Sequence, residues 1–404
     1  MAVSDAADAQ TSWRWVFLLY GAGMLGAFQY ARVAYVLPGL LAQTAMNPLE
    51  QALLLSSMGI IGVLAGTFVG ALGQSMGLLR MLIGGLLLGA VGALLPLAFP
   101  SFAALLSARL VEGVSHMAIA VAVPTLMLML CAPKDKSSAM ALWSCYFTTT
   151  FIVAAFTLPW MLKVGHWQAI VWLHAALLIA MAAVCLRLRT ALVGMPLVPL
   201  VSVRHLLRAQ ARLLSKPGLL VIPATFFGYT LLFVALVNVL PGLLVRSPDF
   251  IPRLALLLPA ASLVGTLLCL AALRGGLGSQ RVVRLAVLGL LLAGVGLLML
   301  PRHSLVTQGV AVFAFILLGL LPAGILSNLS TAFAADDPDI TLVNGGVVQF
   351  GSLGTFLGAP ILASLQPPLG WSAVGSFLLA GTAVIALCPL LLNRAERGRV
   401  KSSL

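Results

Sequence analysis

Long apolar runs alternate with short polar connections along nearly the whole chain. Because an α-helix rises about 1.5 Å per residue, about 20 apolar residues cross the roughly 30 Å hydrocarbon core of a bilayer. Runs of about this length or longer cover residues 15–41, 51–72, 81–99, 103–131, 140–162, 168–187, 217–244, 254–273, 283–300, 305–333, 341–365 and 372–393. The pattern predicts an all-α integral membrane protein with twelve transmembrane helices.

A six-residue sequence occurs twice, at corresponding places in the chain. VLPGLL spans Val36–Leu41, where the first predicted helix ends, and Val239–Leu244, where the seventh ends. The copies begin 203 residues apart (239 − 36), about half of the 404 residues. Repetition at this offset is typical of a duplicated fold. We therefore expect two six-helix pseudo-repeats at 15–187 and 217–393, with tails at 1–14 and 394–404 and a central loop at 188–216.

The composition agrees with a bilayer as the solvent. The chain is 61% hydrophobic and 8% charged, and its mean hydropathy is +1.11. The net charge of +13 comes from Lys and Arg residues scattered in the short connections, a distribution that does not favour nucleic-acid binding. Most of them lie in the connections on the same side as the N-terminus, so the positive-inside rule predicts cytoplasmic termini. A multi-pass protein of a bacterial-type inner membrane is expected, with no obligate protein partner.

The central loop carries a second kind of helical pattern. Arg204, Arg208 and Arg212 follow one another at intervals of four residues in VRHLLRAQARLLSK. Such spacing predicts an amphipathic basic helix lying on the anionic inner leaflet. The alternative is a solvated linker with helical propensity, which leaves the predicted topology unchanged.

The cysteines give no sign of metal, cofactor or redox chemistry. All five lie in or at the ends of apolar runs, without C-x-x-C spacing and without a histidine at ligand spacing. The sequence also lacks paired acids or an activated nucleophile at one membrane depth. It therefore predicts no metal site, no cofactor and no enzyme.

Two six-helix halves joined by a basic central loop resemble the major facilitator superfamily. The resemblance extends to part of its G-x-L-x-D-R-x-G-R motif after the second helix, carried by Gly70, Leu72, Gly77 and Arg80. Gln74 stands where the family has an aspartate, so the charge lock that this motif supports in relatives is not expected. The resemblance implies a secondary transporter that works by alternating access, in which helices one and four line the central cavity.

Two further segments carry the resemblance. In the fourth predicted helix, Arg109 and Gly113 match the family's R-x-x-x-G pattern. In the first, ARVAYVLPG, with Arg32 and Tyr35, is similar to the first helix of some poorly characterised bacterial members. The fifth helix contains Pro159 but not the Gly-Pro-rich antiporter signature, so the drug-exporter subgroup is not favoured.

Three charged residues lie within the first and fourth apolar runs. Arg32, Arg109 and Glu112 each cost several kcal/mol in hydrocarbon unless they face a wet cavity or find a partner. Helical spacing places Arg109, Glu112 and His116 on one face, and Gln29, Arg32 and Tyr35 on another. Since Arg32 and Glu112 lie at similar depth, we predict an ion pair between them, with Arg109 one turn nearer the outside.

Two arginines and one carboxylate leave a net positive site. Such a site attracts an anion, and arginine grips a carboxylate through parallel hydrogen bonds. Arg32, Arg109, Gln29 and Tyr35 are therefore candidate substrate-binding residues. Glu112 is the candidate proton carrier, because it takes a proton when a substrate competes for its arginine, and His116 is the alternative. A purely structural role for the Arg109 and Glu112 motif is the competing interpretation.

The second half supplies polar but uncharged candidates. Tyr229 and Asn238 in the seventh predicted helix are expected to orient the rest of a substrate, although such groups also join helices inside bilayers. The sequence thus predicts a proton-coupled transporter of a small, anionic organic solute, with solute, protons and the lipid bilayer as its partners. Efflux of amphipathic drugs or metabolites is the alternative.

Overall fold

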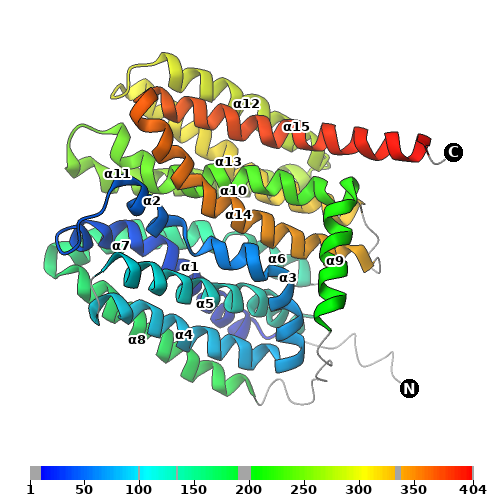
Figure 1. Cartoon of the computed structure of the whole chain (residues 1–404), viewed down its shortest axis with the longest axis horizontal. Helices are drawn as coiled ribbons and strands as arrows, with labels where there is room; N and C mark the ends of the chain where they lie inside the picture. Colours follow the sequence, from blue (N-terminus) through cyan, green and yellow to red (C-terminus); the bar gives the residue numbers. More distant parts are fainter. Residues whose placement is uncertain (1–10, 99–100, 133–134, 190–201, 333–337, 403–404) are drawn as a thin grey trace. The chain divides into compact units, whose positions relative to one another are not determined.

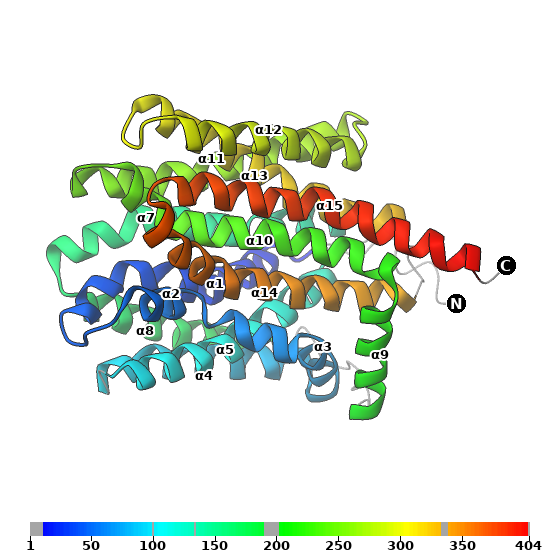
Figure 2. The same cartoon turned by 45° about the horizontal axis from the view of Figure 1, so that its top comes forward.

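The computed structural model describes residues 11–98, 101–132, 135–189, 202–332 and 338–402. Within these ranges the backbone is almost wholly helical and has no strand. The chain divides into two compact units. Unit 1 comprises Met1–Ala45 and Phe68–Leu200, and unit 2 comprises Met46–Thr67 and Val201–Leu404. Figures 1 and 2 show both units as bundles of helices.

Unit 1 is built on the packing of α4 against α5 and α8, and of α1 against α5, α7 and α8. Its core contains fully buried leucines such as Leu19, Leu82, Leu126 and Leu178. Its helices are α1 (Trp13–Leu41), α4 (Leu78–Ala98), α5 (Phe102–Met129), α6 (Lys136–Ser144), α7 (Tyr146–Val164), α8 (Trp167–Cys185) and the short η2 (Leu186–Arg189).

Unit 2 is built around α10, which packs against α13, α14 and α15. Small residues allow the backbones to touch: a Cβ on Gly354 would lie 2.5 Å from the carbonyl oxygen of Phe227. The helices of unit 2 are α2 (Pro48–Ser56), α9 (Val203–Ser215), α10 (Pro217–Leu244), η3 (Pro248–Phe250), α11 (Ile251–Arg274), α12 (Ser279–Met299), α13 (Leu305–Ala332), α14 (Pro338–Leu369) and α15 (Ser372–Ser402). The remaining helix, α3 (Gly59–Met76), begins in unit 2 and ends in unit 1.

Ten helices of the described chain are long and apolar enough to span a membrane, namely α4, α5, α7, α8 and α10 to α15. The chain is therefore a multi-pass membrane protein. The first predicted span corresponds to α1, which has 29 residues but is not among the ten. Gln29, Tyr30 and Arg32 lower its mean hydropathy. The total of twelve spans and the two-repeat arrangement stay predictions.

Two predicted spans are interrupted in the structure. The run at 51–72 is divided between α2 and α3, with a turn at Ser57 and Met58. Directly after this turn, Gly59 packs so closely on α14 that a Cβ would lie 2.5 Å from the Ser352 carbonyl oxygen. The run at 140–162 is divided between α6 and α7 at Cys145. The apolar runs therefore did not predict the breaks, and of the four resulting helices only α7 is among those long and apolar enough to span a membrane.

The basic segment of the central loop is helical, as predicted, and forms α9. Figures 1 and 2 show α9 crossing the direction of α10 and α14. Leu213 is fully buried and packs against Gly346 of α14, whereas Arg204, Arg208 and Arg212 are exposed. Contact of these arginines with lipid stays a prediction, and residues 190–201 of the loop lie outside the described residues.

The C-terminal end of α10 is capped by the connection between α12 and α13. Arg302 Nε donates to the carbonyl oxygen of Leu243 at 2.5 Å, and His303 Nδ1 lies 3.2 Å from that of Leu244. A cation at this end also interacts favourably with the helix dipole. Arg302 therefore stabilises the end of the most buried helix of unit 2.

Candidate functional site

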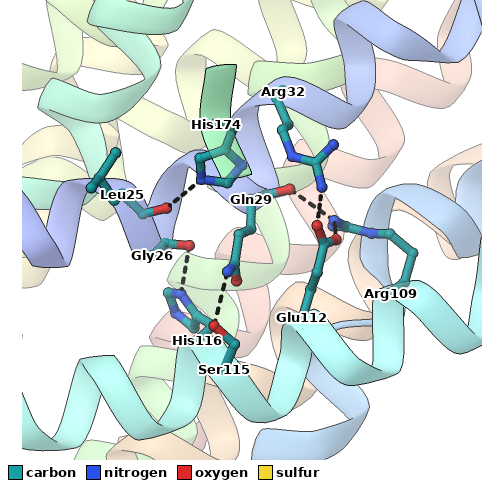
Figure 3. A network of polar contacts seen from close by, with 9 residues as sticks. All are labelled: Leu25, Gly26, Gln29, Arg32, Arg109, Glu112, Ser115, His116 and His174. Carbon is teal, nitrogen blue, oxygen red and sulfur yellow. Dashed lines mark hydrogen bonds and ion pairs between the residues drawn. The ribbon is translucent and has the colours of Figure 1, made fainter. Parts of the chain in front are cut away.

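The ionisable residues predicted within the membrane come together inside unit 1. Arg32 of α1 and Arg109 of α5 both form ion pairs with Glu112 of α5, one with each carboxylate oxygen. We call these three residues the charge cluster. Figure 3 shows the Glu112 carboxylate between the two guanidinium groups. The predicted ion pair between Arg32 and Glu112 is present, and Arg109 shares the same carboxylate.

The charge cluster is almost fully buried. The exposed fractions are 3% for Arg32, 5% for Arg109 and 1% for Glu112. Two guanidinium groups and one carboxylate leave a formal charge of +1 in a region from which water is largely excluded. Burying charge costs free energy even when it is paired, so the uncompensated positive charge lowers the stability of the fold. The arrangement favours the binding of an anion.

Hydrogen bonds connect the charge cluster to the backbone of α1. Arg109 Nη1 donates to the carbonyl oxygen of Gln29 at 2.8 Å, and the Gln29 side chain in turn donates from Nε2 to Ser115 Oγ of α5 at 2.9 Å. Gln29 is fully buried. One residue of α1 thus binds α5 through both its backbone and its side chain, which fixes the two helices relative to each other.

Two histidines bind neighbouring carbonyl groups of α1. His116 Nδ1 of α5 lies 3.1 Å from the Gly26 oxygen, and His174 Nε2 of α8 lies 3.0 Å from the Leu25 oxygen (Figure 3). Because a carbonyl oxygen only accepts, each of these ring nitrogens must carry the proton. The Tyr30 ring packs edge-on against His116 at 5.0 Å between centroids. Both imidazoles therefore hold α1 in place in this structure.

Glycines of α4 make room for the polar side chains. A Cβ on Gly89 would lie 2.4 Å from Gln29 Nε2 and 2.5 Å from Ser115 Oγ. A Cβ on Gly92 would lie 2.8 Å from Cγ of Glu112. Any larger residue at either position would displace the groups that hold the charge cluster.

The other predicted site residues are not brought into this network by any described contact. Tyr35 is partly buried on α1. Tyr229 and Asn238 belong to α10 of unit 2, where Asn238 Nδ2 donates to the Val234 carbonyl oxygen at 2.8 Å within its own helix. Roles for these three residues in substrate binding stay predictions.

Sequence reasoning missed several members of the network. Ser115 is three residues after Glu112, and this spacing on a helix was the signal that could have identified it. His174 lies in the apolar run at 168–187, where a histidine more often has a structural role, and its bond to α1 agrees with such a role. The spacing of Gly89 and Gly92 gave no indication of which side chains they accommodate.

In the part of the chain that the structure describes, potential metal ligands do not form a cluster. Among the residues that the structure describes, no three His, Cys, Asp or Glu side chains are grouped so that they could hold a metal ion.

Comparison with known proteins identifies the family. A search of curated proteins finds no match to this chain. The model of the Major Facilitator Superfamily matches residues 19–359, which cover most of each unit and every residue of the charge cluster. With its apolar helices and its extensive match to this model, the chain belongs to the major facilitator superfamily of secondary transporters.

Proposed function

We propose that the protein transports a small carboxylate anion together with protons. The observation that carries this proposal is the pair of buried arginines that share one carboxylate. A substrate carboxylate has the same charge and geometry as the Glu112 side chain. It is therefore suited to replace that side chain between Arg32 and Arg109.

The geometry of Arg32 supports this exchange. Only Nη2 of Arg32 donates to Glu112, and Nε has no hydrogen-bond partner among the described residues. Nε and Nη2 lie along the edge of the guanidinium group that grips a carboxylate through two parallel bonds. A substrate would make one more hydrogen bond with Arg32 than Glu112 does.

Proton coupling follows from the same exchange. Once a substrate anion occupies the arginines, a charged Glu112 lacks its partners in a buried site, and protonation removes the cost. The substrate then favours the protonated carboxyl, and the protonated carboxyl favours the substrate. This reciprocity is the thermodynamic requirement for coupled transport.

The test uses the full chain reconstituted in liposomes, with protein-free liposomes as the blank for passive permeation. We expect an inward proton gradient to drive accumulation of a small carboxylate such as propanoate. Arg32→Gln should weaken binding roughly 10- to 100-fold, the loss expected for a charge-assisted hydrogen bond. Arg253→Gln replaces an exposed arginine of α11 and serves as the matched control.

Glu112→Gln separates coupling from binding. This variant should still exchange propanoate across the membrane but, in response to the gradient, should accumulate no more of it than the protein-free liposomes do. Accumulation that survives in this variant would place coupling elsewhere. Transport of organic cations in place of anions, or normal transport by Arg32→Gln, would refute the proposed function.

A further inference from the structure

Two buried polar atoms of α1 at the charge cluster have no hydrogen-bond partner among the described residues, one on Gln29 and one on Arg32. Gln29 donates from Nε2 to Ser115, and its Oε1 has no hydrogen-bond partner among the described residues. Arg32 Nε likewise has no hydrogen-bond partner among the described residues. The two side chains are only 0% and 3% exposed. Buried polar groups are almost always hydrogen-bonded, so these two atoms are available to a bound molecule.

The two groups come from one face of α1 and are of opposite kind. Gln29 and Arg32 are three residues apart on one helix, a spacing that places their Cβ atoms about 5–6 Å from each other on one face. Arg32 Nε is a donor, whereas Gln29 Oε1 is an acceptor. Figure 3 shows both side chains extending from α1 near Glu112. A complementary ligand presents an acceptor and, beside it, a hydrogen-bond donor.

The charge of the site decides which donor fits. An ammonium group would be repelled by the two arginines, whose combined charge exceeds that of Glu112. A hydroxyl group donates without carrying charge, whereas a keto oxygen would face Gln29 Oε1 as a second acceptor. The contacts of Gly89 and Gly92 with the polar side chains leave little space, so the ligand must be small.

We propose that the site selects small carboxylates with a hydroxyl group on the carbon next to the carboxylate. The carboxylate binds Arg32 and Arg109, and the hydroxyl group donates to Gln29 Oε1. This inference rests on the proposed function, because it identifies the class of anion that the same arginines bind.

The test compares four ligands that share one carbon skeleton. Binding of propanoate, 2-hydroxypropanoate, 2-oxopropanoate and 2-aminopropanoate is measured by titration calorimetry on the purified full chain in detergent. We expect 2-hydroxypropanoate to bind about tenfold more tightly than propanoate, the factor for one buried hydrogen bond. The oxo acid should gain nothing over propanoate, and the amino acid should bind most weakly.

Substitution of Gln29 tests whether its Oε1 accepts the hydrogen bond from the hydroxyl group. Gln29→Met keeps a side chain of similar length without the acceptor, so propanoate and 2-hydroxypropanoate should then bind equally within about twofold. Gln349→Met is the matched control: Gln349 is also a buried glutamine, on α14 of unit 2, and its loss should leave the tenfold ratio intact. Reading the ratio of affinities removes any general effect of either substitution on folding.

The outcomes separate this inference from the proposed function. Equal binding of propanoate and 2-hydroxypropanoate by the unaltered protein, as expected if only water binds Gln29 Oε1, would overturn the inference alone. A preference for the oxo acid would overturn it too, because it would require a donor at Gln29. Failure of all the carboxylates to bind would overturn the proposed function as well.

Discussion

Replacement of Glu112 by glutamine removes the carboxylate that both arginines share while almost preserving the size of the side chain. In the native protein the charge cluster carries a formal charge of +1, and in Glu112→Gln it carries +2. The three side chains are buried, and Glu112 is only 1% exposed, so water cannot screen the added repulsion. The variant should therefore be less stable than the native protein.

The magnitude follows from the loss of a buried partner. Removal of one member of a buried ion pair costs about 3–5 kcal/mol. The amide oxygen of glutamine still accepts a hydrogen bond, so we expect a loss of about 3 kcal/mol. Arg109→Gln is the comparison variant, because it leaves the Arg32 and Glu112 pair intact and electrically neutral. It should be less destabilising than Glu112→Gln.

An added anion should reverse part of this loss. A ligand at 100 times its dissociation constant stabilises a protein by about 2.7 kcal/mol. The effect should be larger in Glu112→Gln than in the native protein, because no internal carboxylate competes for the arginines. The free energy of unfolding is measured by denaturation in mixed detergent micelles, with and without propanoate, and with chloride as the control for ionic strength. If Glu112→Gln were as stable as the native protein, or if propanoate and chloride raised its free energy of unfolding equally, this account of the site would be refuted.

Two further substitutions test the packing of each unit. Gly92→Ala should lower the free energy of unfolding by about 1–3 kcal/mol, because the new Cβ would lie 2.8 Å from Cγ of Glu112. Gly84→Ala on the same helix is the control: its new Cβ meets no heavy atom within 4 Å, so it should not lower the free energy of unfolding. Equal effects of these two alanines would contradict the close approach of α4 to α5. Arg302→Gln should destabilise unit 2 by about 1–2 kcal/mol, through loss of a charge-assisted bond to the end of α10, and unchanged stability would argue against that cap.

Much of the architecture was determined by the sequence alone. Each polar residue in hydrocarbon costs free energy, so the apolar runs directly mark the segments that can cross the bilayer. For the same reason, an ionisable residue within such a run must find a partner. This argument predicted the ion pair between Arg32 and Glu112, and the helical period placed Arg109 and Glu112 on one face. The family resemblance was confirmed by the match to residues 19–359.

Tertiary structure decided the features that the pattern of apolar and polar residues within a single segment does not predict. An apolar run looks the same whether its helix is continuous or broken, so the turn at Ser57 and Met58 could not be foreseen. The partners of His116 and His174 are backbone carbonyl groups of α1, and every residue has a carbonyl group, so no side-chain pattern reveals which one is bound. The sequence therefore determined which charges must be paired, and the packing of α1, α4, α5 and α8 determined the geometry in which they are held.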